Sequence, residues 1–159
     1  MDKIKAIVTE IYNDLKILEG GLGVADYIPE LACVDPNSLG ISVCHVNGDI
    51  FNIGDCDKFF GLQSCSKPLS YCIAYDELGK EDLHSRVGYE PSGQAFNAFI
   101  LNKNGLPHNP MINAGAIMVA SQIGKNKEPA NRFNILKSFY SRLAGNKKVG
   151  FDNSVFLSE

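Results

Sequence analysis

Apolar side chains recur at helical spacing in two segments of the chain. One face of residues 3–18 carries Ile4, Ile7, Val8, Ile11 and Leu15. This spacing predicts an amphipathic helix, which Gly20 and Gly21 are expected to end. Residues 130–144 repeat the pattern with Phe133, Leu136, Tyr140 and Leu143. That second amphipathic helix is expected to close at Gly145.

The segment GISVCHVNGDIFNIGD, residues 40–55, has the pattern of two short strands. Asn47 and Gly48 lie between the strands, and this dipeptide favours a tight type I′ turn because both residues tolerate a positive φ. The sequence therefore predicts a β-hairpin at this point in the chain.

The rest of the chain is expected to be mostly helical. A helix is predicted from the mid-60s to Leu78, where Gly79 favours a left-handed cap. Residues 88–113 are rich in Gly, Pro and Asn, which predicts a long irregular stretch of the kind that often carries function. The apolar helix AGAIMVASQI follows and is expected to be buried on most sides, and Asn153 or Ser154 could cap a final helix. The predicted fold class is therefore α+β, with one hairpin and helices around it.

Composition narrows the classes of function. The chain has 159 residues, 45% of them hydrophobic and 21% charged, as in a globular domain. Its net charge of −3, without a basic cluster, argues against a nucleic-acid surface. The apolar runs are too short to span a membrane, and the N-terminus has the features of neither a signal peptide nor a transit peptide. Five cysteines without a C-x-x-C pair favour reduced thiols in the cytoplasm, and no metal or cofactor is expected.

The stretch QSCSKPL, residues 63–69, places Ser64 three residues before Lys67. A chain of this length contains roughly one S-x-x-K match by chance, so the position of the match matters more than its presence. Pro68 fits only in the first turn of a helix, which puts Ser64 at an N-terminal edge where unpaired N–H groups stabilise negative charge. Lys67 lies about one turn further, between apolar flanks that would lower its pKa. The pair is a candidate nucleophile and base.

Five blocks of sequence carry a resemblance to a known family. They are VADYIPELA (24–32), QSCSKPL (63–69), EPSGQAFNAFIL (90–101), GLPHNPMINAGAI (105–117) and AGNKKVGFDNSVFLSE (144–159). In order and spacing they resemble the serine-dependent glutaminases, which share the fold of β-lactamases and penicillin-binding proteins. The resemblance implies that residues 1–159 form a single partial catalytic domain, the N-terminal part of that fold, with an incomplete sheet.

The resemblance also implies an activity and a set of site residues. The activity is hydrolysis of L-glutamine to L-glutamate and ammonia through a serine acyl-enzyme. Ser64 resembles the nucleophile, Lys67 the base that activates it, and Tyr27 an active-site tyrosine near the reacting groups. The residues that resemble the family's substrate-binding groups are Gln63, Ser64, Asn113 and Glu159.

Plainer structural roles stay open for each of these residues. Ser64 could cap a helix while Lys67 extends along the surface. Asn113 could be a helix cap and Tyr27 could pack beside a proline. Glu159 is the last residue, and a terminal glutamate is normally solvated and mobile.

The chain also departs from the family, whose catalytic domain is much longer. The later part of that domain contributes a further asparagine, further tyrosines, a lysine-containing strand and a second oxyanion donor. The isolated chain is therefore expected to leave a sheet edge and an apolar face uncovered. We also expect it to have little or no glutaminase activity.

Two other functions stay open. One is a penicillin-recognising acyl-serine hydrolase, which requires S-x-N and K-T-G motifs that are not evident here. The other is a non-enzymatic module that assembles with a full-length glutaminase. The resemblance implies L-glutamine as ligand and a homo-oligomer, a tetramer in the family, with neither nucleic acid nor membrane as partner. A cytoplasmic location is expected, or a mitochondrial one in a eukaryote, although no transit peptide is visible.

Overall fold

The computed structural model describes residues 1–18, 23–145 and 149–159, which fall into two compact units. The first unit comprises Met1–Gly61 and Asp152–Glu159, and the second comprises Leu62–Phe151. Gly20 and Gly21, predicted to end the first helix, lie outside the described residues.

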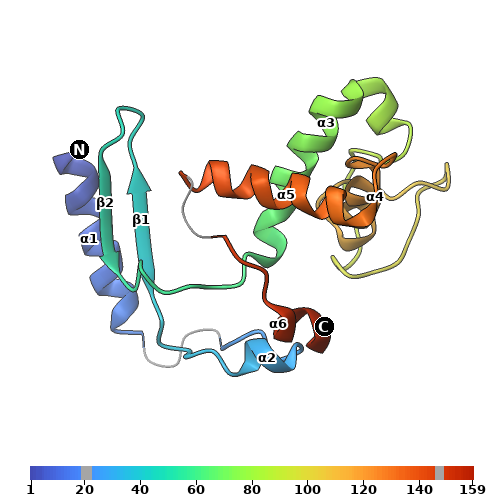
Figure 1. Ribbon diagram of the computed structural model, residues 1–159. Helices are drawn as coiled ribbons and strands as arrows, with labels where there is room; N and C mark the ends of the chain where they lie inside the picture. The colour runs from blue at the N-terminus through green and yellow to red at the C-terminus, as the bar shows by residue number, and fades with distance from the viewer. Residues whose placement is uncertain (19–22, 146–148) are drawn as a thin grey trace. The chain divides into compact units, whose positions relative to one another are not determined.

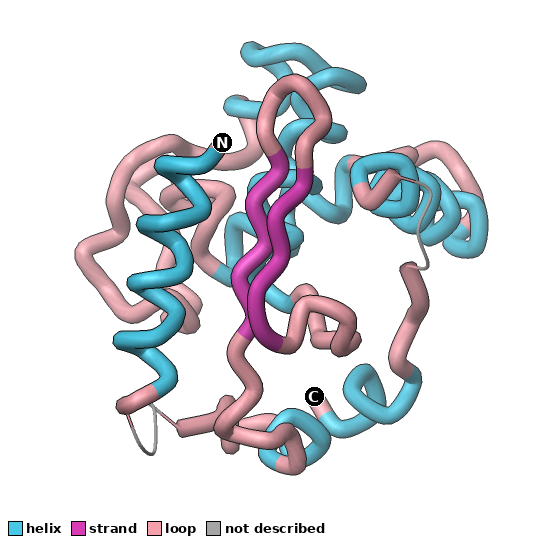
Figure 2. The backbone as a smooth tube through the Cα atoms, turned by 90° about the vertical axis from the view of Figure 1, so that its left-hand side faces the viewer, coloured by secondary structure: helices cyan, strands magenta, loops and turns pink. Residues whose placement is uncertain are grey.

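The first unit contains a helix packed against a hairpin. Helix α1 (Asp2–Lys16) confirms the predicted amphipathic helix. Strands β1 (Gly40–Cys44) and β2 (Ile50–Gly54) pair antiparallel, with Val43 opposite Phe51. Figures 1 and 2 both show α1 beside the hairpin, and Lys5 Nζ lies 5.9 Å from the centre of the Phe51 ring. Because alternate residues of a strand share a face, the half-buried residues Ile41, Val43, Phe51 and Ile53 form the apolar side of the hairpin.

The turn of the hairpin differs from the predicted type I′ turn. The Gly48 N–H donates to the His45 carbonyl oxygen (2.9 Å), and Gly48 has a φ of 93°. Among the described residues other than glycine, only Gln63 has a positive φ, so Asn47 is not left-handed and the type I′ prediction is wrong. Asn47 instead accepts a hydrogen bond at Oδ1 from the Asp49 N–H (3.1 Å). A type I turn followed by a left-handed glycine closes the hairpin.

Two short helices pack together in the same unit. They are α2 (Pro29–Ala32), which begins with a proline, and α6 (Asn153–Ser158). The predicted final helix is therefore present, but neither predicted residue caps it. Asp152 is the N-cap, and its carboxylate accepts hydrogen bonds from the N–H groups of the second and third residues of α6, at 2.9 and 3.1 Å. A carboxylate satisfies these donors and also complements the positive end of the helix.

The second unit is built from three longer helices. A 3₁₀ turn, η1 (Gln63–Cys65), leads into α3 (Ser66–His84), and α4 (Asn113–Gln122) packs on α3. Helix α5 (Pro129–Leu143) confirms the second amphipathic prediction, and Gly145 follows it with a φ of 65°. The core of the unit consists of Ile73, Ala74, Leu83, Val87, Val119 and Ile123.

Helix α3 is interrupted where the sequence predicted an end. Gly79 has a φ of 77° and a ψ of 170°, which stops the regular helix at Leu78. A further helical turn then runs to His84, which the sequence did not predict.

The long segment between α3 and α4 is irregular, as predicted, with one isolated bridge that pairs Leu101 with Pro107. The prediction that α4 is buried on most sides is confirmed, with one side left open. Ala114, Gly115 and Val119 are buried, but Ile117 is 60% exposed. One side of this apolar helix is therefore open.

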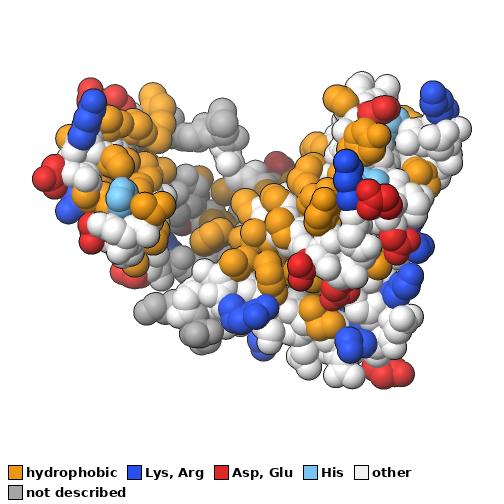
Figure 3. Space-filling model, turned by 90° about the horizontal axis from the view of Figure 1, so that it is seen from above, with side chains coloured by type: hydrophobic (Ala, Val, Ile, Leu, Met, Phe, Trp, Pro, Cys, Tyr) orange, Lys and Arg blue, Asp and Glu red, His pale blue; other side chains and the backbone are white. Residues whose placement is uncertain are grey.

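Large apolar side chains lie open on the surface of both units, and Figure 3 shows hydrophobic side chains gathered on the face seen there. Exposed aromatic residues include Phe59 and Phe156 in the first unit and Phe96 and Phe99 in the second. This agrees with the expectation of uncovered apolar surface. In the described parts of the chain, no helix is both long enough and apolar enough to cross a membrane.

Candidate active site

A strained turn carries the candidate nucleophile. Gln63, immediately before Ser64, has a φ of 44°, an unusual conformation for a residue with a side chain. The turn is held by a hydrogen bond from the Cys65 N–H to the Leu62 carbonyl oxygen (3.0 Å) and by another from Ser66 Oγ to the Gln63 carbonyl oxygen (2.6 Å). Strain of this kind persists only where neighbouring contacts fix it, and it often marks a functional site.

The start of α3 agrees with the position inferred from Pro68. The helix begins at Ser66, so Pro68 falls in its first turn. Cys65 occupies the N-cap position, which means that Ser64 is not the helix cap. The Ser64 residue is exposed and lies in the 3₁₀ turn, two residues before the first residue of α3. Its hydroxyl is therefore accessible to a ligand near the positive end of α3.

Lys67 is half-buried and makes a short hydrogen bond. Its Nζ donates to Asn113 Oδ1 at 2.6 Å, a contact between α3 and α4 that joins residues 46 positions apart. Burial lowers the pKa of Lys67 below the usual lysine value. Within the described residues no hydrogen bond joins Lys67 to the Ser64 hydroxyl. In an apo enzyme, such a contact often tightens only when substrate binds.

The hydrogen bond to Lys67 fixes how Asn113 is oriented. An amine on a lysine stem donates, so Asn113 presents its oxygen to Lys67 and its NH₂ group elsewhere. Asn113 is the first residue of α4, and its backbone N–H donates to the Phe96 carbonyl oxygen (3.0 Å). Ile112 occupies the N-cap position, so the alternative role of Asn113 as a cap does not apply. The NH₂ group can donate to an anionic ligand.

The structure brings together only some of the predicted site residues. Gln63, Ser64, Lys67 and Asn113 all belong to the second unit, and Lys67 and Asn113 are in contact. Tyr27 and Glu159 belong to the first unit, where Tyr27 precedes α2 and Glu159 follows α6. Tyr27 is 70% exposed and Glu159 is also exposed. The roles of Tyr27 and Glu159 in the site stay predictions.

The candidate site in the second unit combines three polar groups. In the described part of the chain, no group of three or more His, Cys, Asp or Glu side chains is arranged to hold a metal ion. All five cysteines are free thiols. The arrangement offers an exposed hydroxyl, a desolvated amine and an amide donor, which together suit attack on a carbonyl carbon.

The positive φ of Gln63 and the part played by the Phe96 carbonyl were not predicted from the sequence. No sequence signal marks either, because glutamine carries no conformational preference for that region and a backbone carbonyl has no identity of its own.

Sequence comparison finds relatives that belong to one family. A model of the family described as Glutaminase matches residues 23–159. A glutaminase of Aliivibrio salmonicida is 43% identical over 162 residues, covering 100% of this chain and 52% of that protein. The mitochondrial liver isoform of glutaminase from Rattus norvegicus is 45% identical over 152 residues, covering 96% of this chain and 25% of that protein.

Solved structures resemble this chain in fold as well as in sequence. One is described as "Probable glutaminase ybaS", with a TM-score of 0.88 and 31% identity, and it matches 99% of this chain. The match covers 50% of that chain. This chain therefore spans about half the length of the Aliivibrio salmonicida protein and of this solved structure, and 25% of the Rattus norvegicus protein.

Proposed function

Because the chain belongs to the glutaminase family, we propose that it supplies the nucleophile and base of an active site that hydrolyses L-glutamine to L-glutamate and ammonia. The observation that carries this proposal is the pairing of a half-buried lysine with Asn113, one turn beyond an exposed serine on a strained turn. The β-lactamase-like fold of the family supports the proposal, because β-lactamases and penicillin-binding proteins use a serine nucleophile in an S-x-x-K motif.

The proposed reaction begins with proton transfer from Ser64 to the neutral amine of Lys67. Ser64 Oγ attacks the side-chain carbonyl carbon of glutamine, and the carbonyl oxygen becomes an oxyanion that backbone N–H groups near the start of α3 stabilise. Collapse of this intermediate breaks the carbon–nitrogen bond, and the leaving nitrogen takes the proton and departs as ammonia. Water then attacks the acyl-enzyme ester, which releases glutamate and restores the serine hydroxyl.

Asn113 has two tasks in this proposal. Its oxygen accepts the hydrogen bond from Lys67, which holds the amine at a fixed place beside the turn. Its NH₂ group is then directed toward the substrate and donates to the α-carboxylate of glutamine. Glu159 is proposed to pair with the α-ammonium, and Tyr27 and Gln63 to complete the pocket.

The chain covers about half of its bacterial relatives, so we propose that the remaining catalytic groups come from a part of the domain outside residues 1–159. The test compares this chain with a chimera, called here the completed chain, in which the second half of the Aliivibrio salmonicida glutaminase follows Glu159. The completed chain is expected to release glutamate from glutamine, and residues 1–159 alone are expected to show little or no release. The assay measures glutamate and ammonia together.

Each outcome of that comparison has a clear meaning. Vigorous glutamine hydrolysis by residues 1–159 alone would refute the need for further groups. A completed chain that folds, as judged by circular dichroism, but does not hydrolyse glutamine would refute the proposed activity. Labelling of Ser64 by a fluorescent penicillin, without glutamine turnover, would favour the penicillin-recognising alternative. Tetramer formation, also proposed from the family, is measured on the same sample by light scattering.

The contact between Lys67 and Asn113 predicts a pH dependence. Only the neutral amine accepts a proton, so kcat/KM should rise as the pH rises through the pKa of Lys67. This rising limb of the pH profile should lie at a lower pH than for an ordinary lysine, because burial lowers the pKa of Lys67. Asn113→Asp puts a carboxylate at the atom that Lys67 contacts, which favours the ammonium form. In the completed chain the limb should move to higher pH by about 1–3 pH units.

The control for this prediction is Asn131→Asp, which makes the same charge change at an exposed position of α5. That variant should leave the pH profile unchanged. An Asn113→Asp profile that coincides with that of the parent would show that Lys67 is not the group that titrates.

A further inference from the structure

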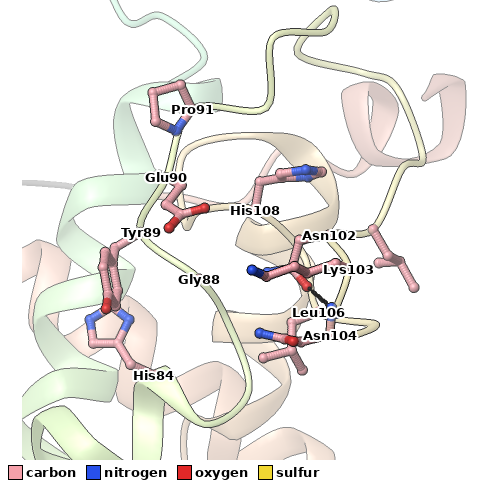
Figure 4. Close-up of a pocket in the computed structure, with 11 residues that line it drawn as sticks. His84, Gly88, Tyr89, Glu90, Pro91, Asn102, Lys103, Asn104, Leu106 and His108 are labelled. Carbon is pink, nitrogen blue, oxygen red and sulfur yellow. Dashed lines mark hydrogen bonds between the residues drawn. The ribbon is translucent and has the colours of Figure 1, made fainter.

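The second unit contains a cavity that the proposed chemistry does not use. It lies between the segment after α3 and the loop at residues 101–108, and its volume is about 550 Å³. Figure 4 shows Glu90 on one wall and Asn102 and Asn104 on the other. Neither Ser64, Lys67 nor Asn113 lines it. Its size is within the usual range of small-molecule sites.

Backbone hydrogen bonds hold the two walls of this cavity in place. The Gly88 N–H donates to the Pro107 carbonyl oxygen (2.8 Å), and the Glu90 N–H donates to the His108 carbonyl oxygen (3.0 Å). A Cβ atom on Gly88 would lie only 2.5 Å from the His108 carbonyl oxygen, so the close approach of the walls requires glycine there. On the far wall, Asn102 Oδ1 accepts from the Leu106 N–H (3.1 Å) and fixes the loop. The cavity is preformed.

Two opposite charges line the cavity from opposite walls. Glu90 comes from the segment after α3 and Lys103 from the loop. Across the described ranges of the chain, neither side chain takes part in an ion pair. The Nδ1 atom of His108 is buried and, among the described residues, has no hydrogen-bond partner. The cavity therefore offers a negative group on one wall and a positive group on the other.

His84 forms part of the wall of the cavity. Its Nδ1 lies 3.0 Å from the Val87 carbonyl oxygen and must donate to it, because a carbonyl oxygen can only accept. Its Nε2 lies 2.9 Å from the Tyr71 hydroxyl oxygen, and the Tyr89 ring packs against the imidazole edge-on. Both ring nitrogens already have partners, so recognition of a charged ligand falls to Glu90 and Lys103.

We propose that this cavity binds a free α-amino acid with an apolar side chain, as a site distinct from the one at Ser64. The α-ammonium group pairs with Glu90 and the α-carboxylate with Lys103, which are charge-assisted contacts to both ends of the zwitterion. The side chain of the ligand packs against the apolar part of the lining, which includes Pro91, Leu101 and Leu106. A ligand with only one of the two charges leaves one wall unmatched.

The test uses residues 1–159 and three probes: L-leucine, N-acetyl-L-leucine, which lacks the ammonium, and L-leucinamide, which lacks the carboxylate. Binding is followed by NMR from the backbone and side-chain amide signals of the chain, and those of residues 88–108 report on the cavity. L-Leucine is expected to shift these signals. Each blocked analogue is expected to bind at least about tenfold more weakly than L-leucine. Glu90→Gln and Lys103→Met should weaken leucine binding to a similar degree. Lys80→Met, at an exposed position of α3, is the matched control and should not.

The outcomes separate this proposal from the proposed function. Absence of shifts in residues 88–108 at saturating concentrations of leucine would overturn it, as would equal binding of all three probes. Shifts confined to residues around Ser64 and Asn113 would also overturn it, and would leave the glutaminase proposal standing. Loss of leucine binding in Lys80→Met to the same degree as in Lys103→Met would show that the charge effect is not local.

Discussion

Replacement of Lys67 by alanine in the completed chain is expected to lower kcat for glutamine hydrolysis by about 10²–10⁴-fold, the usual worth of a positioned general base. The structure explains why this lysine is suited to the task. Its amine is half-buried, its pKa is lowered by that burial, and Asn113 holds it one turn beyond the serine. Ser64→Ala removes the nucleophile itself and should cost at least as much. The measurement is steady-state release of ammonia.

The double variant gives the sharper test. Groups that act in one step lose their effects together, so Ser64→Ala combined with Lys67→Ala should be little worse than the worse of the single variants. Lys80→Ala changes an exposed lysine of the same helix and serves as the control. If the losses from Ser64 and Lys67 multiply, the two residues do not act as one unit. If the Lys67 variant keeps most of its activity, another group is the base.

Gly115→Ala is expected to lower the free energy of unfolding by about 1–3 kcal/mol, the range for overpacking a close contact. Gly115 is buried in the first turn of α4, where the helix lies close to the preceding segment, and a Cβ atom there would overlap the carbonyl oxygen of Asn109. It would also lie 3.2 Å from the Cα atom of Pro110. Because all of these atoms belong to backbone, no side-chain rotation relieves the overlap. Urea denaturation measures the change as a lower midpoint.

The chain provides a matched control for this substitution. Gly150→Ala adds the same atom at a site where nothing lies within 4 Å and where the φ is not positive. This variant should leave the midpoint of unfolding almost unchanged. A Gly115→Ala protein as stable as the parent would mean that the segment around Asn109 moves freely away from α4. Such movement would also loosen the position of Asn113, two residues earlier in the chain.

The longer helices and the hairpin were predictable because they depend on patterns that lie within one segment, whereas the short helix α2 was not predicted. The apolar spacing of α1 and α5 and the alternation in β1 and β2 needed no knowledge of the rest of the chain. The details at segment ends were not predictable, because several neighbouring residues compete for the same backbone groups. The turn at Asn47 and the cap of α6 at Asp152 were decided in this way. In both places a side-chain oxygen accepts a hydrogen bond from the backbone N–H two residues further along the chain.

The candidate site was predictable in part for a similar reason. The spacing of Ser64 and Lys67 before Pro68 is local, so it fixed the start of α3 to within two residues. The hydrogen bond from Lys67 to Asn113 joins two helices 46 residues apart, and only the packing of α4 on α3 creates it. The exposed face of α4 at Ile117 was missed because an evenly apolar helix gives no sign of which side is open.

The left-handed backbone at Gln63 sets a trade-off between durability and reactivity. A glycine at this position would adopt the same φ without steric cost. Selection for thermal stability alone would therefore favour glycine there. A glycine would also leave the Ser64 hydroxyl less well positioned, because the backbone before Ser64 would be free to adopt more conformations. Glutamine at position 63 therefore gives up some stability in exchange for a fixed position of the Ser64 hydroxyl.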